Sequence, residues 1–390
     1  MTALMPIYPN RLPISFTRGD GVWLFDEKNT AYLDALSGIA VCGLGHAHPA
    51  VTKTLCDQAE KLLHTSNTYH VPEQVPLADT LARLSGMDEV FYANSGAEAN
   101  EAALKLARLY AHQRGIDRPL LITMEKSFHG RTMGTLSASG SARLQQGFEP
   151  LLEGFVHIPF NDLSALKRVI ATQSDRIIGI MLEPIQGDGG IREVNADFFE
   201  AIRYYCDEHD WLLIADEIQT GLGRTGAWFA YQHYGILPDI VTVAKTLGNG
   251  FPIGAYLTRG KANGLFTVGK HGSTFAGSPL GCAVALTVLE TLEKQSLVAH
   301  AQQMGTQLMQ TLQEKLGQHP RIVALRGKGL MIGIELDRPC RELPKIGLQH
   351  RLLFNVVSDR TIRLLPALIL QEEHLDLIVS RLTAAINELE

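Results

Sequence analysis

The chain has 390 residues, 45% of them hydrophobic and 19% charged, which is the composition of a globular protein with one large core or two moderate ones. The net charge of −6 is spread along the sequence without a run of five like charges, which argues against nucleic acid and membrane surfaces as partners. The five cysteines are odd in number, scattered and never spaced as C-x-x-C, which predicts a reducing, cytoplasmic location.

The chain opens on MTALMPIYPN, which lacks a basic stretch followed by an apolar one, and no later apolar run reaches the length of a membrane span. We therefore expect neither export nor membrane insertion. Further on, His46 and His48 form a His-x-His pair beside Pro49. No Cys or Asp completes a tetrahedral set, so the pair is interpreted as part of a turn and no metal is expected.

Between residues 89 and 245, short apolar runs alternate with amphipathic stretches. Strands are expected at EVFYANSG, LLITMEKSF, FVHIPF, RIIGIMLEP, WLLIADE and DIVTVAK, and helices at 97–112, 162–172 and 197–209. This alternation predicts an α/β fold in which a mostly parallel sheet lies between helices. Ligands of such sheets bind outside the carboxyl ends of the strands, so the residues at those ends are the candidates for a site.

Several of the expected strands end in polar or charged residues. These are Asn94-Ser95-Gly96, the stretch 128–131, Glu183, Asp216-Glu217 and Lys245. Burying a lysine or an aspartate without a partner is costly, so their presence at the ends of apolar strands indicates a functional site.

From residue 280 onward the pattern changes. Long helices are expected at 281–297 and 300–317, followed by strands in GLMIGIELD and TIRLLPALIL and by a closing helix from about residue 372. This order predicts a smaller α+β domain at 280–390, after a large domain at 49–279. Residues 1–48 are expected to pack with the small domain.

Two glycine-rich strings are similar to nucleotide-binding motifs. Gly221 to Gly226 fit G-x-G-x-x-G, but that fingerprint turns directly from a strand into a helix, and residues 216–220 intervene here. Gly264 to Lys270 fit G-x-x-x-x-G-K, yet His271 stands where a phosphate-binding loop needs Ser or Thr. Both strings are interpreted as loops. A nicotinamide dehydrogenase, which rests only on the first string, is therefore disfavoured.

Residues 95–97 form a small-residue turn between a strand and an Ala/Leu-rich helix. The free N–H groups and the dipole of such a helix start bind phosphate, although Ser95 fits equally well as a plain helix cap. Lys245 lies between an apolar strand and the glycine-rich TLGNGFPIGA, so a desolvated amine that forms a Schiff base with an aldehyde is favoured over a surface lysine. Together with the ring of Phe128 and the carboxylate of Asp216, these parts match pyridoxal 5'-phosphate.

The sequence resembles the class III (ω-amino) aminotransferases, which have the pyridoxal-phosphate fold type I. The resemblance covers nearly the whole chain and rests on GIAVCGLGHAHP, NSGAEANEAALKLAR, SFHGRTMGTL, EPIQGDGG, LIADEIQTGLGRTG, AKTLGNGFPIGA, GSTFAGSPLGCA and IRLLPALIL, in that order. It implies a large domain with a mostly parallel sheet between helices, a smaller α+β domain, and pyridoxal 5'-phosphate as the cofactor.

The same resemblance implies roles for individual residues. Lys245 would carry the cofactor as an imine and then move a proton as general base and acid, while Asp216 would keep the pyridine nitrogen protonated. Thr274 is similar to a residue lent to the cofactor phosphate of the other subunit, which implies a homodimer with shared active sites. The remaining cofactor-binding residues would be Ser95, Gly96, Ala97, Phe128, Ile218 and Gln219. The substrate-binding residues would be Arg131, Ser273, Arg363 and Glu183, the last as ion-pair partner of Arg363.

For the reaction, the resemblance implies transfer of the terminal amino group of N2-acetyl-L-ornithine to 2-oxoglutarate. The products would be N-acetyl-L-glutamate 5-semialdehyde and L-glutamate, in arginine biosynthesis. Gly38 stands where ornithine δ-aminotransferases have a Tyr, which leaves room for an N-acyl group. N-Succinylornithine, N-succinyl-diaminopimelate and 4-aminobutyrate remain alternative amino donors. A pyridoxal-phosphate aminomutase would share the lysine and the aspartate but would turn over without an added 2-oxo acid.

Overall fold

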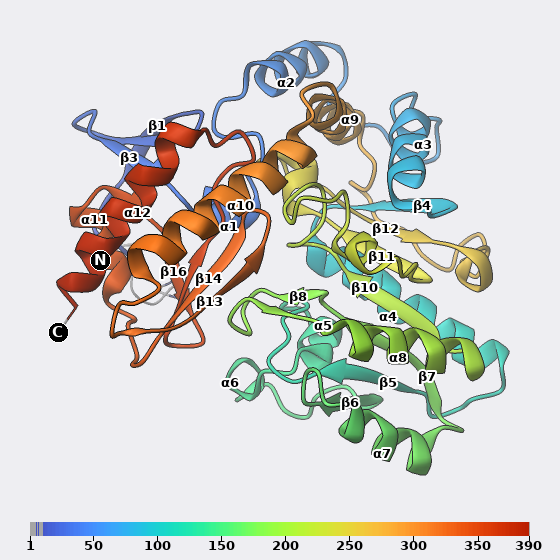
Figure 1. Cartoon of the computed structure of the whole chain (residues 1–390). Coiled ribbons are helices and arrows are strands. Elements are labelled where there is room, and N and C mark those ends of the chain that lie inside the picture. The colour runs from blue at the N-terminus through green and yellow to red at the C-terminus, as the bar shows by residue number, and fades with distance from the viewer. Residues whose placement is uncertain (1–4, 6, 8–10, 390) are drawn as a thin grey trace.

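The structure is a computed structural model that describes every residue except 1–4, 6, 8–10 and 390. The expectation that the first ten residues carry no export signal therefore falls largely outside the described residues. The described chain forms a large domain, a smaller C-terminal domain and a group of N-terminal strands (Figure 1). The boundaries at residues 48 and 279 stay predictions.

A seven-stranded sheet forms the centre of the large domain. Its strands follow the order β4 (Glu89–Ala93), β12 (Gly254–Thr258), β11 (Ile240–Val243), β10 (Leu212–Asp216), β7 (Ile177–Leu182), β5 (Leu120–Met124) and β6 (Phe155–Ile158). In this sheet β12 alone runs antiparallel to its neighbours, so the mostly parallel sheet is confirmed. The sequence pattern did not predict β12, because this short strand follows directly on a glycine-rich loop.

Helices bury both faces of this sheet (Figure 1). One face is covered by α4 (Gly96–Gln113), and the other by α3 (Gln74–Ser85), α7 (Leu163–Gln173), α8 (Ala196–Glu208) and α9 (Pro279–Lys294). Leu212 and Ile214 of β10 pack in the core under α4, whereas Leu213 and Ala215 pack in the core on the opposite face of the sheet, as expected for a strand buried on both sides. None of the described helices is long and apolar enough to cross a membrane.

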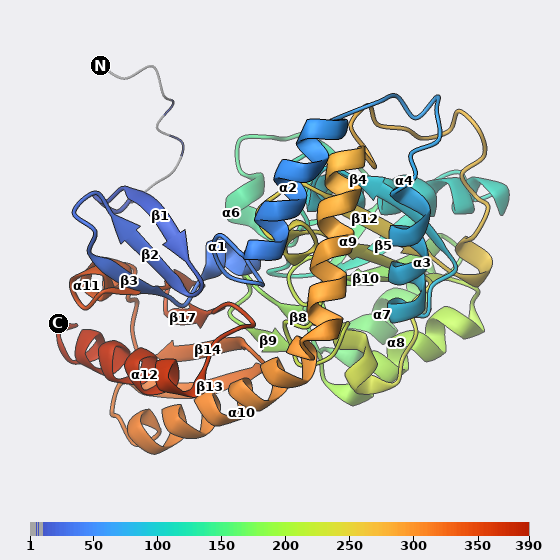
Figure 2. The same cartoon turned by 90° about the horizontal axis from the view of Figure 1, so that it is seen from above.

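The smaller domain is built on a second sheet, with the order β13 (Ile322–Lys328), β14 (Met331–Leu336), β17 (Thr361–Leu364) and β16 (Asn355–Val357). Against it pack α10 (Leu297–Leu316) and, through α10, α12 (Glu372–Asn387). A hairpin of β8 (Ile185–Gln186) and β9 (Arg192–Glu193) from the large domain lies beside this sheet (Figure 2).

The N-terminal strands lie beside the small domain (Figure 2). They are β1 (Phe16–Asp20), β2 (Trp23–Asp26) and β3 (Ala31–Asp34), and β15 (Leu352–Leu353) of the small domain completes their sheet. The N–H of Ala35 donates to the carbonyl of Leu353 at 2.9 Å, which continues this pairing. The chain then crosses to the large domain through α2 (Pro49–Lys61), which packs on α9.

Candidate active site

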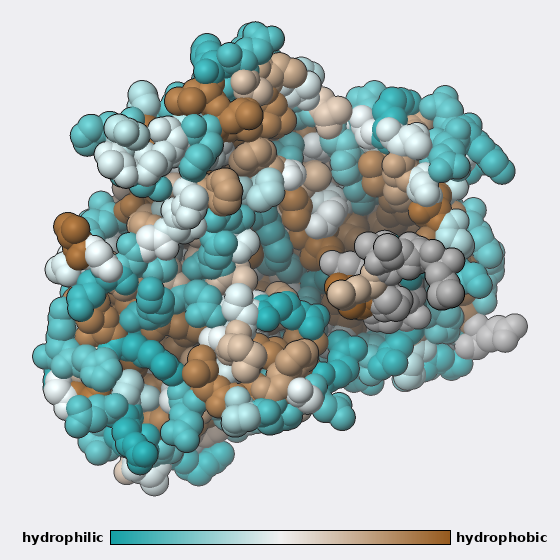
Figure 3. Space-filling model, turned by 180° about the vertical axis from the view of Figure 1, so that it is seen from behind, coloured by the Kyte–Doolittle hydropathy of each residue, from teal (hydrophilic) through white to brown (hydrophobic). Residues whose placement is uncertain are grey.

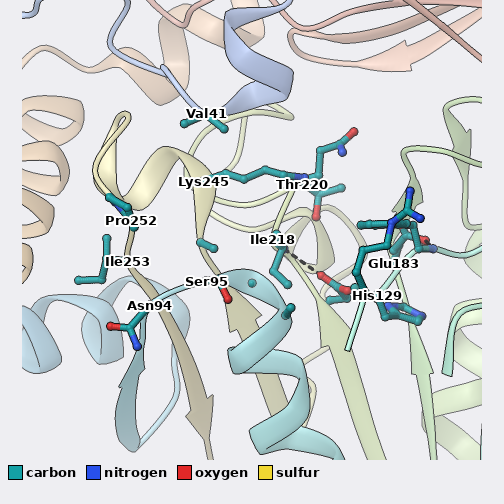
Figure 4. A pocket seen from close by; sticks show the side chains of 18 of the residues that line it. Val41, Asn94, Ser95, His129, Glu183, Ile218, Thr220, Lys245, Pro252 and Ile253 are labelled. Atoms are coloured by element: carbon teal, nitrogen blue, oxygen red, sulfur yellow. Dashed lines mark hydrogen bonds and ion pairs between the residues drawn. The ribbon is translucent and has the colours of Figure 1, made fainter. Parts of the chain in front are cut away.

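The carboxyl ends of the large-domain strands open into a cavity of about 410 Å³ (Figure 4). The strand ends bring residues that are far apart in the sequence to one place. Among the lining residues are the following expected ones: Ser95, Gly96, Ala97, Phe128, Arg131, Glu183, Asp216, Ile218, Gln219 and Lys245.

The first turn of α4 forms one end of the cavity. Ser95 is the N-cap of this helix, because its Oγ accepts a hydrogen bond from the N–H of Glu98 at 3.2 Å. Gly96 is needed at the next position, since a Cβ there would lie 2.8 Å from the side chain of Ile218. The N–H groups and the dipole of this helix start therefore border the cavity as a site for an anion such as a phosphate.

The carboxylate of Asp216, at the end of β10, is buried and held by three groups. Its Oδ2 accepts a hydrogen bond from Asn100 Nδ2 at 2.8 Å and lies 2.7 Å from His129 Nδ1, while its Oδ1 accepts one from the N–H of Ile218 at 3.1 Å. Burial by itself lowers the pKa of His129, but the hydrogen bond and the charge of Asp216 outweigh it and raise that pKa above its usual value. The imidazole is thereby held as a donor toward Asp216.

Asn100 was not expected in the site, and His129 was expected only as part of the stretch 128–131, without a role of its own. Asn100 lies inside α4 and resembles an ordinary polar residue of an Ala-rich helix. His129 did carry a signal, because it follows Phe128 just after a buried strand, where an imidazole needs a polar partner.

Lys245 begins the short helix η2 (Lys245–Gly248) directly after β11, and its side chain extends across the cavity (Figure 4). Its φ angle of 48° is uncommon for a residue with a Cβ. Part of its surface is open to the cavity, yet desolvation, followed by the nearby cation of Arg363, lowers the pKa of its amine to about 8. More of this amine is therefore neutral and nucleophilic at neutral pH than in a lysine exposed to water.

A strained turn closes the cavity on the side of the N-terminal strands. Residues 37–40, labelled α1 (Ser37–Ala40), all have positive φ angles, including the β-branched Ile39 at 67°. Asp34 holds the start of the turn by accepting from the N–H groups of residues 36 and 37 at 2.9 Å, and Thr246 donates from Oγ1 to the carbonyl of residue 40 at 3.1 Å. The turn sets Val41 in the cavity wall (Figure 4) and ties it to the loop after β11.

Arg363, on β17 of the small domain, lies behind the cavity wall and contacts residues that line the cavity. Its guanidinium is buried and donates from Nη1 to Asp188 Oδ1 at 2.8 Å and from Nε to Asn355 at 3.1 Å. Asp188 lines the cavity. This ion pair therefore joins the two domains at the site.

Glu183 is not the partner of Arg363 in the structure, so that expectation is wrong. Its carboxylate accepts instead from the N–H of Phe128 at 3.1 Å and from the N–H of Gly187 at 3.2 Å. Glu183 follows β7 and turns toward the end of β5, whereas the loop between β8 and β9 carries Asp188 across to β17. Desolvation raises the pKa of Glu183 to about 7.

Arg131 lines the cavity at its rim, whereas Ser273 and Thr274 do not line it. The guanidinium carbon of Arg131 lies 5.7 Å from the centre of the Phe128 ring. Ser273 accepts a hydrogen bond from the cavity residue Asn94 at 3.0 Å. Thr274 is exposed and does not line the cavity, so one subunit by itself does not bring it to the site.

Residues 7–386 match the family model described as aminotransferase class-III. The chain belongs to this family. The acetylornithine aminotransferase of Nitrosomonas europaea is 50% identical over 99% of this chain and 98% of its own. The ornithine aminotransferase structure from Toxoplasma gondii has a TM-score of 0.94 at 32% identity, covering 99% of this chain and 94% of its own. The acetylornithine aminotransferase structure from Elizabethkingia anophelis has a TM-score of 0.87 at 32% identity, with coverages of 99% and 96%.

This class-III aminotransferase is a pyridoxal-phosphate-dependent transaminase of fold type I, as the resemblance implied. The groups that line the cavity match the chemical groups of pyridoxal 5'-phosphate. The start of α4 offers N–H groups to a phosphate, and Lys245 offers a desolvated amine to an aldehyde. Asp216 Oδ1 accepts a hydrogen bond from the N–H of Ile218 and keeps a second lone pair for a donor in the cavity, such as a protonated pyridine nitrogen.

Proposed function

We propose that this aminotransferase moves the terminal amino group of N2-acetyl-L-ornithine to 2-oxoglutarate, giving N-acetyl-L-glutamate 5-semialdehyde and L-glutamate in arginine biosynthesis. The names of its full-length bacterial relatives support this substrate. The structural observation that carries the proposal is the ion pair between Arg363 and Asp188 at the cavity wall. The charge of Arg363 is available to the α-carboxylate of glutamate, and Asp188 neutralises this charge when N-acetylornithine is bound.

The cofactor roles in this proposal follow from the cavity. Residues 95–97 would hold the phosphate, Phe128 and Ile218 would contact the ring, and Gln219 would bind its phenolic oxygen. Bound pyridoxal 5'-phosphate supplies an electron sink for the substrate carbon that loses its proton. With the cofactor bound, Asp216 would keep the pyridine nitrogen protonated, and Lys245 would take up and return the substrate proton as general base and acid.

Two substrates with different charges share this site. Glutamate carries two carboxylates, whereas N-acetylornithine carries one, at the far end from the reacting amine. Arg131 binds the distal carboxylate of both, assisted at the rim by Ser273. Arg363 binds the α-carboxylate of glutamate, and Asp188 neutralises it when the acylated substrate is bound, since an unpaired buried cation is costly.

Asp188→Asn should weaken the half-reaction with N-acetylornithine more than the half-reaction with glutamate. Without its counter-ion, Arg363 would face the uncharged part of the acylated substrate as an unpaired cation. Stopped-flow absorbance of the cofactor in single turnovers measures each half-reaction separately. Glu183→Gln is the matched control, because this carboxylate has no contact with Arg363, and it should affect both halves alike. Equal losses in both halves for Asp188→Asn would contradict the switch.

A panel of amino donors tests the proposed substrate. We expect the highest kcat/KM with N-acetylornithine, because the strained turn carries Gly38 where ornithine δ-aminotransferases have a Tyr, and it sets only the small side chain of Val41 in the cavity wall. Unacylated ornithine should be at least about tenfold poorer. N-Succinylornithine, N-succinyl-diaminopimelate and 4-aminobutyrate complete the panel. A higher kcat/KM for any of these would move the assignment to that donor, and turnover without a 2-oxo acid would identify an aminomutase.

We also propose a homodimer with shared active sites. Among the described residues, large apolar side chains are exposed on two loops and at the start of α3: Leu62, Leu63, Tyr69, Val75, Val268 and Phe275. The two loops lie together, since the ring of His64 is 5.2 Å from that of Phe275 and Asn67 donates to the carbonyl of Ala276 at 2.9 Å. On the face seen from behind, apolar side chains border part of a hollow (Figure 3). An apolar face that includes the loop of Thr274 fits a second subunit.

Mixed dimers test whether Thr274 completes the site of the other subunit. Lys245→Ala chains lack the amine, and Thr274→Val chains lack the hydroxyl lent to the phosphate, so each homodimer should be impaired. Hybrids formed by mixing should recover activity, because one of their two sites combines an intact lysine with an intact threonine. Failure to recover activity in hybrids verified by light scattering and mass spectrometry would rule out a shared site.

We propose a cytoplasmic location, because the cysteines are not paired in disulfides. All five are free thiols, and Cys206, Cys282 and Cys340 are buried. Unpaired thiols fit a reducing compartment. Fractionation of the source cells with antibody detection checks this location.

A further inference from the structure

Arg224, within the GLGRTG loop, is fully buried where the two domains meet, with an exposed fraction of 0%. Burial lowers the pKa of its guanidinium to about 9, and none of the ion pairs between described residues includes Arg224. In the same described part of the chain, its Nε and Nη2 atoms have no hydrogen-bond partner. An uncompensated buried cation is costly, so its place in the fold needs a reason.

The partners of Arg224 are backbone carbonyls of the small domain. Its Nη1 donates to the carbonyl of Leu330 at 3.0 Å and to that of Pro366, and the N–H of Leu330 donates back to the carbonyl of Arg224 at 3.0 Å. Leu330 directly precedes β14, and Pro366 lies just beyond the end of β17. In this strand pair, Arg363 of β17 stands opposite Gly333 of β14. One guanidinium therefore holds both strands beside the position of Arg363.

Glycines on both sides of the junction let the loop and the small domain approach closely. A Cβ on Gly329, whose φ is 54°, would lie 2.4 Å from the carbonyl carbon of Thr225. A Cβ on Gly226, whose φ is 85°, would lie 2.1 Å from the side chain of Gln302 on α10. At Gly329 backbone thus packs on backbone, which leaves little room for the GLGRTG loop to shift against the turn before β14.

The GLGRTG loop is also continuous with the cofactor site. Asp216 and Gln219 come just before it, and Gln219 accepts a hydrogen bond from Arg363 Nη1 at 3.4 Å. Arg363 itself lies three residues before Pro366. The contacts of Arg224 therefore connect the segment that faces the cofactor to the strand that presents the substrate arginine.

We propose that Arg224 is a positioning residue that sets the place of Arg363 relative to the cofactor. It thereby determines the affinity for the α-carboxylate of glutamate and 2-oxoglutarate, while the binding of a substrate without a carboxylate next to the reacting carbon depends on it little. This inference rests on the proposed role of Arg363.

Arg224→Met tests the inference in the holoenzyme. Methionine fills much of the same space but removes the charge and the donors to both carbonyls. The apparent dissociation constant in the glutamate half-reaction should rise about tenfold or more, whereas that for N-acetylornithine should change less than about twofold. Arg224→Lys keeps the cation and a donor, so it should restore part of the glutamate affinity. A general loss of rigidity would not produce this split between substrates.

Control variants separate positioning from stability. Arg203 is a largely buried arginine on α8 that binds Asp239 and the carbonyl of Leu237, and Arg203→Met should lower the melting temperature without a split between substrates. If Arg224→Met does not fold, Gly329→Ala displaces the same junction with the charge intact and should produce the same split.

Arg363→Ala, measured alongside, tests the proposed role of Arg363 separately from the inference about Arg224. If this variant leaves the affinity for glutamate unchanged, the proposed role of Arg363 fails, and the inference about Arg224 fails with it. If Arg363→Ala weakens glutamate binding but neither Arg224→Met nor Gly329→Ala shifts glutamate more than N-acetylornithine, only the inference about Arg224 is overturned.

Discussion

Lys245→Ala is expected to abolish transamination while the protein stays folded. The variant loses both the amine that attaches the cofactor and the group that moves the proton, so turnover should fall by about 10⁴-fold or more. Stability should not suffer, because the change removes a desolvated amine that the cation of Arg363 disfavours. Turnover with N-acetylornithine and 2-oxoglutarate, together with a thermal melt, measures both expectations.

Lys261→Ala is the matched control for this variant. Lys261 is a half-buried lysine of the same domain that binds Asp210 at 3.2 Å, away from the cavity. Its removal should leave turnover unchanged. Full turnover in Lys245→Ala, with the cofactor still bound, would overturn the assignment of the catalytic lysine.

Asp216→Asn should lower turnover by at least about a hundredfold, or ~3 kcal/mol, because it removes the charge that keeps the pyridine nitrogen protonated. The amide also fits its surroundings poorly. Asn100 Nδ2 and His129 donate to one carboxylate oxygen and the N–H of Ile218 donates to the other, so either orientation of the amide sets its NH2 group against a donor. The single-turnover rate of the glutamate half-reaction, at saturating cofactor, measures the effect.

Asp239→Asn distinguishes a local electrostatic effect from the general cost of changing a buried acid. Asp239 is buried next to the same sheet, where it accepts from the N–H of Leu213 at 2.8 Å and binds Arg203. We expect Asp239→Asn to lower stability and to leave turnover nearly intact. A loss below roughly tenfold, or ~1.4 kcal/mol, for Asp216→Asn would mean that this carboxylate is structural only.

The central sheet could be predicted from the sequence because its strands are buried on both faces. A strand such as β7, with every residue buried, must be an unbroken apolar run, and such runs are visible in the sequence. The elements that escaped prediction lack this signal. β1 to β3 are short and mostly only partly buried. β12 is buried throughout, but it is the short segment GAYLT directly after a glycine-rich loop, so no apolar run marks it in the sequence.

Much of the candidate site could also be predicted, because parallel strands end at one edge and Asp216 and Lys245 are costly residues to bury at such ends. The sequence could not show which of the two carboxylates in EPIQGDGG pairs with Arg363. Glu183 and Asp188 both carry a carboxylate and are close in the chain, and the path of the hairpin alone decides that Asp188 reaches Arg363.

The sequence by itself determined the fold class, the edge of the sheet at which the site forms, and the family, since apolar runs and short motifs carry that information locally. Only the tertiary structure decided which groups contact one another across elements. Asn100 and His129 hold Asp216, residues 37–40 adopt a left-handed turn, and Arg224 is buried against carbonyls of the small domain. Each of these contacts depends on distances between segments far apart in the chain, and a hydrogen bond forms only where those segments come within about 3 Å.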